Sequence, residues 1–186
     1  YLISELGMTE SQLGMVSAFY FIPVAVLAII VGRALDKYSV KNFMMIGAII
    51  YAVGLFSLSF INSYWSLLTI YLTILALGSI MMGNLAVSKL IANWFDKNAG
   101  RALGIAAIGI SFSGVMLPLI VDPLLELVGW RNVYVIFASI VFFIILPLVF
   151  FTVIDDPKAV NQVKDGVKKD YKEEFIPEEM TSNDLL

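Results

Sequence analysis

The sequence contains no cysteine and no histidine. Without cysteine the chain has no disulfide framework and no thiolate that could act as a nucleophile or metal ligand. Without histidine it also lacks the commonest general base and metal ligand. Most hydrolase and metalloenzyme functions are therefore disfavoured. We expect a protein that is not an enzyme, with no catalytic residue, no metal site and no cofactor.

Charge is also scarce in most of the chain. Of the 12 basic and 15 acidic residues, 13 lie in residues 1–154 and 14 lie in residues 155–186. The net charge is −3, and the basic residues form no stripe or patch, which argues against nucleic acid as a partner. The hydrophobic share is 60%, well above the roughly 45–50% of soluble domains. These values indicate an integral membrane protein with a polar C-terminal tail.

Long runs without charge indicate where the chain crosses the bilayer. A helix needs roughly 20 apolar residues to cross the hydrocarbon core. The second run is long enough for two crossings and is interrupted by the turn-prone residues 62–65. We therefore predict an all-α polytopic membrane protein with five transmembrane helices. The charge-free runs are 11–32, 42–88, 102–121 and 132–154, and the predicted helices are 10–32, 43–61, 65–91, 101–121 and 131–154.

The distribution of Lys and Arg predicts the orientation. Basic residues concentrate around residues 33–42 and 92–101, whereas the opposite side has only Arg131. Cytoplasmic loops carry the excess of Lys and Arg, so these two segments are predicted to be cytoplasmic, in a plasma or inner membrane. Residues 1–9 are then external and residues 155–186 form a cytoplasmic linker. Because the chain opens on the external side, we interpret it as a fragment with an upstream span missing.

Four polar residues in the predicted spans are candidates for a substrate cavity. They are Tyr20, Asn84, Ser88 and Ser111. A polar group inside the membrane is costly unless it meets a partner or water. For Asn84 we expect a hydrogen bond between helices, with substrate contact as the alternative. The serine hydroxyls can instead bond to carbonyls of their own helix.

Three further expectations concern packing and charge near the membrane faces. Small residues recur on one face of the helix predicted at 101–121, including Gly104 and Gly114, so we expect that helix to be wedged between neighbours. Lys89 lies near a cytoplasmic helix end, where its ammonium is expected to reach the interface. On the external side, Arg131 is expected to pair with Asp122 and Glu126.

The loop between the first two predicted helices carries a recognisable motif. Residues 32–41 read GRALDKYSVK. This segment resembles the signature G-x-x-x-D-[RK]-x-G-[RK]-[RK] of the major facilitator superfamily, with matches at Gly32, Asp36, Lys37 and Lys41. In that superfamily the motif lies in the cytoplasmic loop between the second and third helices.

The resemblance implies a conformational switch. The motif's acid and basic residues are credited in the superfamily with holding cytoplasmic helix ends together in one state of the transport cycle. By resemblance, Gly32, Asp36 and Lys37 would form this switch, with Asp96 and Arg101 as charge partners. The alternative is that these charges only set topology, but an acidic residue such as Asp36 contributes little to topology.

A second motif narrows the resemblance. Residues 94–105 read WFDKNAGRALGI, and residues 129–131 read GWR. Together they resemble the monocarboxylate porter branch and its oxalate:formate antiporter-like relatives. The resemblance implies helices two to six of a twelve-helix fold, with the first helix and the C-terminal six-helix half missing. It implies as partners the lipid bilayer, a small-molecule substrate, and a coupling proton or a counter-substrate.

The implied function is secondary active transport of a small organic solute, a monocarboxylate or other organic anion, by alternating access. A sugar, drug or other metabolite is the alternative within transport. From another class, a helical membrane scaffold without a substrate path fits the spans but not a polar face at Asn84 and Ser88. A membrane enzyme ranks last, because the sequence offers no cluster of acid, base, metal ligand or nucleophile.

Overall fold

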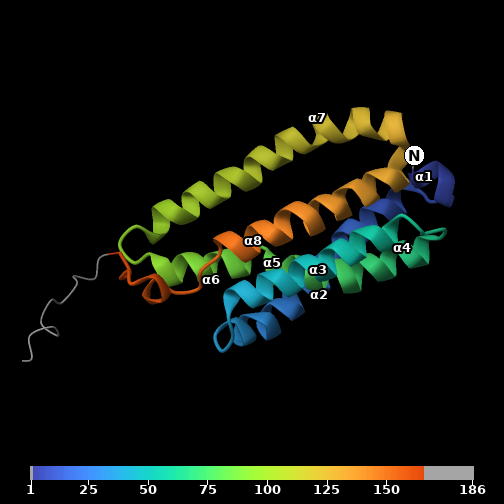
Figure 1. Ribbon diagram of the computed structural model, residues 1–186. Coiled ribbons are helices and arrows are strands. Elements are labelled where there is room, and N and C mark those ends of the chain that lie inside the picture. Colours follow the sequence, from blue (N-terminus) through green and yellow to red (C-terminus); the bar gives the residue numbers. More distant parts are fainter. Residues whose placement is uncertain (1, 166–186) are drawn as a thin grey trace, which may run out of the picture.

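The computed structural model describes residues 2–165, and every regular element in that range is helical (Figure 1). The predicted all-α class is confirmed for this part of the chain. The elements are α1 (Leu2–Leu6), α2 (Glu10–Leu35), α3 (Val40–Leu58), α4 (Tyr64–Ile70), the π-helix η1 (Tyr71–Leu75), α5 (Ala76–Met82), α6 (Asn84–Trp94), α7 (Ala99–Ile140), the π-helix η2 (Val141–Ile145), α8 (Leu146–Thr152) and the 3₁₀ turn η3 (Pro157–Val160).

Side-chain caps define where the first helices begin. The Thr9 hydroxyl accepts the backbone N–H of Gln12, and the Gln12 side chain accepts the N–H of Thr9, which makes a capping box at the start of α2. Ser39 caps α3 and Ser63 caps α4 in the simpler one-sided way. α2 and α3 lie within a few residues of the predicted helices 10–32 and 43–61.

The helix predicted at 65–91 is present but interrupted. The stretch Tyr64–Trp94 is divided into α4, η1, α5 and α6. Five residues adopt a π-helix, and the backbone leaves helical geometry at Gly83, where ψ is −150°. A π-turn and a backbone break inside one span are local features that a hydrophobic run does not encode.

The last predicted boundary is wrong in detail. We expected a loop between helices 101–121 and 131–154, but α7 continues through that region and, with η2 and α8, makes one stretch, Ala99–Thr152. Only Gly129 departs from helical geometry, with φ 75° and ψ 159°. Within residues 2–165, four helical stretches are thus long and apolar enough to cross a membrane. Figure 1 shows that the ribbon of α7 nevertheless reverses direction and runs back toward the end of the bundle where α7 began.

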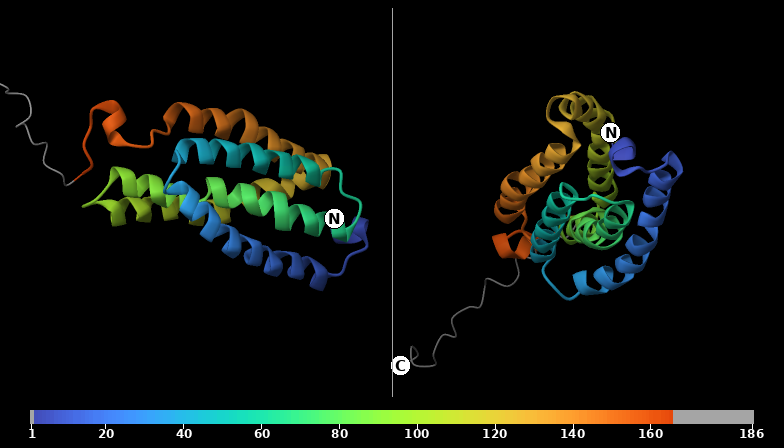
Figure 2. Two further views of the ribbon diagram at one scale, coloured as in Figure 1. Left: turned by 90° about the horizontal axis from the view of Figure 1, so that it is seen from below. Right: turned by 90° about the vertical axis from the view of Figure 1, so that its right-hand side faces the viewer.

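α3 occupies the centre of the packing. It contacts α5 on one side and the returning part of α7 with η2 and α8 on the other, while α2 packs against η1, α5 and α6 (Figure 2). Buried side chains form two clusters, one containing Leu58, Leu67 and Trp130 and the other Leu35 and Val149. The bundle is therefore built around α3.

The first half of α7 differs from our expectation. We predicted that its small residues would be wedged between neighbours, yet no other part of residues 2–165 lies within 4 Å of a Cβ built on Gly104, Gly109 or Gly114. The close approach of helices occurs instead between α3 and α5. The small stripe of α7 is thus open within the described residues.

Large apolar side chains cover the outside of the bundle. Phe21 is 69% exposed, Ile105 70% and Phe143 71%. Soluble monomers rarely expose contiguous apolar surface on this scale. Lipid is the solvent in which such a surface is stable, in agreement with the length and hydropathy of the four stretches.

Candidate functional site

A pocket between α6 and α7 contains two of the polar residues that the sequence singled out. It has a volume of about 230 Å³. Asn84 and Ser88 line it from α6, one helical turn apart, and both side chains are exposed. The opposite wall comes from α7 and is apolar. The residues of that wall are Leu103, Ala106, Ala107 and Ile110.

The backbone break at Gly83 explains why Asn84 faces this pocket. Asn84 is the first residue of α6, immediately after the chain leaves the axis of α5. Among residues 2–165, neither the Asn84 amide nor the Ser88 hydroxyl hydrogen-bonds to another protein group. The helix–helix hydrogen bond that we expected at Asn84 is therefore not observed among these residues. Both side chains are available to water or to a solute.

The structure places the other two cavity candidates elsewhere. The Tyr20 hydroxyl donates a hydrogen bond to Ser79 Oγ at 2.6 Å, and Ser79 Oγ donates to the carbonyl of Ala76 at 3.0 Å. The Tyr20 ring also meets the ring of Tyr71 edge to face. Tyr20 thus joins α2 to α5. Ser111 is exposed on α7 outside the pocket between α6 and α7.

An ion pair joins the C-terminal end of α2 to the middle of α6, toward the predicted cytoplasmic side. Asp36, at the C-terminal cap of α2, lies with its Oδ1 2.6 Å from Nζ of Lys89 on α6. The side chains are 69% and 35% exposed, so water and salt screen the pair. Gly32 lies one turn before Asp36, and a Cβ built there would meet Leu85 of α6 at 3.7 Å. The end of α2 and the middle of α6 are therefore neighbours.

This geometry differs from the expected set of charge partners. We expected Asp96 and Arg101 to partner the motif, but Asp36 pairs with Lys89 in this conformation. Within residues 2–165, Lys37 and Arg101 form no ion pair, and the backbone N–H of Asp96 donates to Asp165. Lys89 was expected only to reach the membrane interface. The sequence nevertheless contained a signal that Lys89 has a partner. It is the one charged residue between Lys41 and Asp96.

The predicted external side carries a second charged cluster. Arg131 Nη1 lies 2.5 Å from Oε2 of Glu5, and Arg131 Nη2 donates to the carbonyl of Ile61 at 3.2 Å. The expected pairing of Arg131 with Asp122 and Glu126 is wrong, because α1 brings Glu5 to Arg131 instead. The indole N–H of Trp130 also donates to Glu5.

These contacts affect the Glu5 carboxyl. The hydrogen bond from Trp130 lowers the pKa of Glu5 below its ordinary value, with Arg131 acting in the same direction and desolvation opposing. Glu5 therefore remains a carboxylate at neutral pH. The cluster connects α1, the turn after α3 and the returning part of α7.

The part of the chain that the structure describes offers no constellation for metal binding. No group of three or more Asp and Glu side chains in residues 2–165 is close enough to hold a metal ion. The polar chemistry available is that of the Asn84 amide, the Ser88 hydroxyl and two partly exposed ion pairs. Such groups can bind a solute and stabilise a conformation.

Comparison with known proteins identifies the family. The Major Facilitator Superfamily model matches residues 1–179. Three relatives agree with it. MFS-type transporter 1 of Ophiocordyceps sp. (strain BCC 1869) is 27% identical over 75% of this chain and 31% of its own length. The uncharacterized MFS-type transporter YcxA of Bacillus subtilis (strain 168) is 25% identical over 83% of this chain and 37% of its own length. The riboflavin transporter MCH5 of Saccharomyces cerevisiae is 26% identical over 59% of this chain and 21% of its own length.

The chain thus spans well under half the length of these relatives. No solved structure matches the chain significantly. The family match covers the ion pair of Asp36 and Lys89, the pocket at Asn84, and the external cluster. Together with the helical stretches and their apolar surface, it shows a multi-pass integral membrane protein. The chain therefore belongs to the major facilitator superfamily.

Proposed function

We propose that this chain is part of a secondary active transporter that moves a small organic solute by alternating access. The observation that carries the proposal is the pocket at Asn84 and Ser88, where two polar side chains without protein partners face an apolar wall. A transported solute needs such a site, with binding strong enough to select and weak enough to release. A carrier of this kind leaves its solute chemically unchanged, so we expect no enzyme activity.

We further propose that the four helical stretches make five crossings, corresponding to helices two to six of the superfamily fold. The stretch Ala99–Thr152 has 54 residues, or roughly 80 Å of helix, which is more than twice the ~30 Å hydrocarbon core. Its reversal near Gly129 returns the chain to the side on which α7 began (Figure 1). The first helix and a C-terminal six-helix half would lie in the remainder of the transporter.

For the solute we propose a monocarboxylate or other organic anion, on the branch resemblance of the motifs at residues 94–105 and 129–131. A second candidate is another metabolite, because one relative is named a riboflavin transporter. The pocket at Asn84 and Ser88 is lined by neutral groups only. A charge that recognises an anion would therefore come from another part of the transporter.

Cysteine labelling tests the pocket. The native chain contains no cysteine, so single replacements give an unambiguous signal. We expect Asn84→Cys and Ser88→Cys to react with a water-soluble thiol reagent at least about tenfold faster than Ser139→Cys. Candidate solutes should slow the reaction at the first two positions. The readout is the labelled fraction of full-length transporter in membrane vesicles over time.

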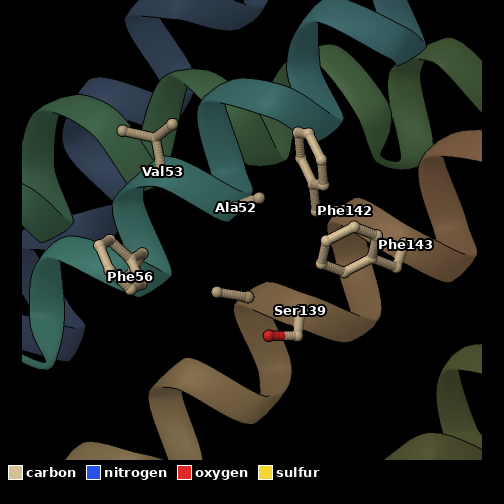
Figure 3. Close-up of a pocket in the computed structure, with 7 residues that line it drawn as sticks. Ala52, Val53, Phe56, Ser139, Phe142 and Phe143 are labelled. Carbon is tan, nitrogen blue, oxygen red and sulfur yellow. The ribbon is translucent and has the colours of Figure 1, made fainter.

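Ser139 is a matched control, since it is also an exposed serine within a helical stretch. Its side chain lines an apolar pocket of about 270 Å³ between α3 and the returning helix (Figure 3). Phe56, Phe142 and Phe143 surround that pocket, which faces the outside of the bundle. Equal protection at Asn84, Ser88 and Ser139 would refute the cavity and favour a scaffold.

The ion pair between Asp36 and Lys89 provides a test of the switch. We expect Asp36→Asn to slow transport and to change the cytoplasmic reactivity of a cysteine at Ser88 by about two- to fivefold, without reducing membrane insertion. The size follows from the screened pair, which is worth about 0–1 kcal/mol in the state that contains it. Labelling from each side of the membrane, with transport measured in parallel, supplies the readout.

Exchanging the charges makes this test specific. The double variant Asp36→Lys with Lys89→Asp should return the reactivity at Ser88 close to its native value and recover most of the lost transport. Lys97→Gln removes a nearby exposed charge and should have little effect. If Asp36→Asn behaves like the native protein, or if the exchanged pair is as impaired as the single variants, the switch assignment is wrong.

A further inference from the structure

The chain does not leave the bundle where its last span ends. We expected a free linker from residue 155, but Val153 and Pro157 are buried, and the 3₁₀ turn η3 keeps the chain at the cytoplasmic ends of the helices (Figure 1). Asn161 then adopts the left-handed conformation, with φ 56°. This turn directs the chain toward the loop between α6 and α7. Residues 166–186 of the expected linker lie outside the described residues.

The first attachment of this segment is to the ends of α6 and α3. The Trp94 indole N–H donates to the carbonyl of Ile154 at 2.7 Å, and the Asn93 amide donates to the carbonyl of Asp155 at 3.0 Å. The Asp155 carboxylate accepts the backbone N–H of Lys41 at 2.7 Å. Lys41 is the second residue of α3, so a negative charge lies at a helix N-terminus, where the helix dipole favours it.

The second attachment is to the loop before α7. The Asp165 carboxylate accepts backbone N–H groups of Asp96 and Asn98, the latter at 2.9 Å, with a different oxygen for each. The Asp165 N–H donates to the carbonyl of Trp94 at 3.3 Å. The hydrogen bond from Asp96 lowers the pKa of Asp165 below its ordinary value. Asp165 is therefore an anion that holds the start of α7.

We propose that residues 154–165 form a strap that holds the cytoplasmic ends of α3, α6 and α7 together as one unit. Near one end of the strap the Asp155 carboxylate accepts a backbone N–H of α3, and at the other the Asp165 carboxylate accepts backbone N–H groups just before α7. Between α6 and the strap, two side chains at the end of α6 donate to backbone carbonyls of the strap. It lies beside the ion pair, because Lys41 follows Asp36 by five residues and Asn93 follows Lys89 by four. The strap therefore positions the two helices that Asp36 and Lys89 join. This inference rests on the contacts themselves and does not depend on the transport proposal.

Amide hydrogen exchange on the full-length protein in detergent tests the strap. Asp165→Ala removes both acceptors, and we expect the amides of Asp96 and Asn98 to exchange roughly tenfold faster, as expected for a lost hydrogen bond to a charged group. Asp165→Asn retains one acceptor oxygen and should have an intermediate effect. Asp156→Asn is the matched control, since its side chain caps only its own turn at Lys158.

A strap makes a stronger prediction than two separate caps. Asp155→Ala should speed exchange at Lys41 and also, about two- to threefold, at Asp96 and Asn98, because detaching one end loosens the other. An effect confined to Lys41 would overturn the strap and leave two independent caps. Unchanged exchange in Asp165→Ala, or equal acceleration in Asp156→Asn, would overturn it as well.

Discussion

Replacing Gly78 with alanine is expected to lower the free energy of unfolding by about 2–3 kcal/mol, because the new methyl group overlaps backbone atoms of α3. A Cβ built on Gly78 lies 2.7 Å from the N atom of Tyr51 and 2.8 Å from its Cα. Backbone atoms cannot rotate away, so α3 and α5 must separate. Unfolding of purified protein in a denaturing detergent titration measures the loss.

A glycine of α3 makes an equally close approach to α5 at the same crossing. A Cβ built on Gly47 of α3 would lie 2.7 Å from Cβ of Met81 and 2.9 Å from the N atom of Met82. In lipid, where apolar burial drives helix association only weakly, close backbone approach at small residues is a main source of helix–helix affinity. The crossing of α3 and α5 therefore has little tolerance for added volume on either helix.

Gly104→Ala is the matched control for Gly78→Ala. Gly104 is also a helical glycine, but nothing in the described chain lies within 4 Å of a Cβ built there. We expect no loss of stability, or a gain of about 0.5–1 kcal/mol from the better helix propensity of alanine. If the two variants lose stability equally, the packing explanation for Gly78 fails.

Replacing Gly129 with alanine is expected to cost about 1–3 kcal/mol, for a different physical reason. With φ 75° and ψ 159°, Gly129 occupies a backbone region that is essentially restricted to glycine. Nothing lies within 4 Å of a Cβ built there, so the cost comes from backbone conformation and not from a clash. The variant should also shift the fluorescence of Trp130, because Trp130 follows the reversal directly and bonds to Glu5.

Gly109→Ala serves as the control for Gly129→Ala, since Gly109 lies in the same long helix without a positive φ or a close neighbour. It should leave both the unfolding transition and the fluorescence of Trp130 unchanged. Unaltered stability in Gly129→Ala would mean that α7 can reverse in another way. In that event the backbone strain assigned to Gly129 would be wrong.

Helix starts were predictable wherever a local signal existed. Thr9 and Gln12 form a capping box, and the starts of α2 and α3 lie within three residues of those predicted. The charge-free runs placed the start of the last helix at residue 131, two residues after the break at Gly129, but ended the preceding helix too early, at residue 121. Asp122 and Glu126 indicated a polar loop there, but helical hydrogen bonding continues past them to Gly129.

The candidate site was predicted in part. Asn84 and Ser88 were selected because polar groups inside a span are costly, and the structure brings them to one pocket. Tyr20 met the same criterion, yet its hydroxyl is satisfied by Ser79, which is 59 residues away in sequence. Polarity within a span identifies a group that needs a partner but does not identify the partner.

The sequence by itself determined that this chain is a bundle of membrane helices, because the apolar length of each run and the backbone hydrogen bonds of a helix are local properties. Motif residues likewise identified the superfamily. Only the tertiary structure decided that Asp36 pairs with Lys89, that Arg131 pairs with Glu5, and that Asp165 holds the start of α7. These contacts join segments 53 to 126 residues apart. Long charged side chains can reach several partners, and lateral helix packing selects among them.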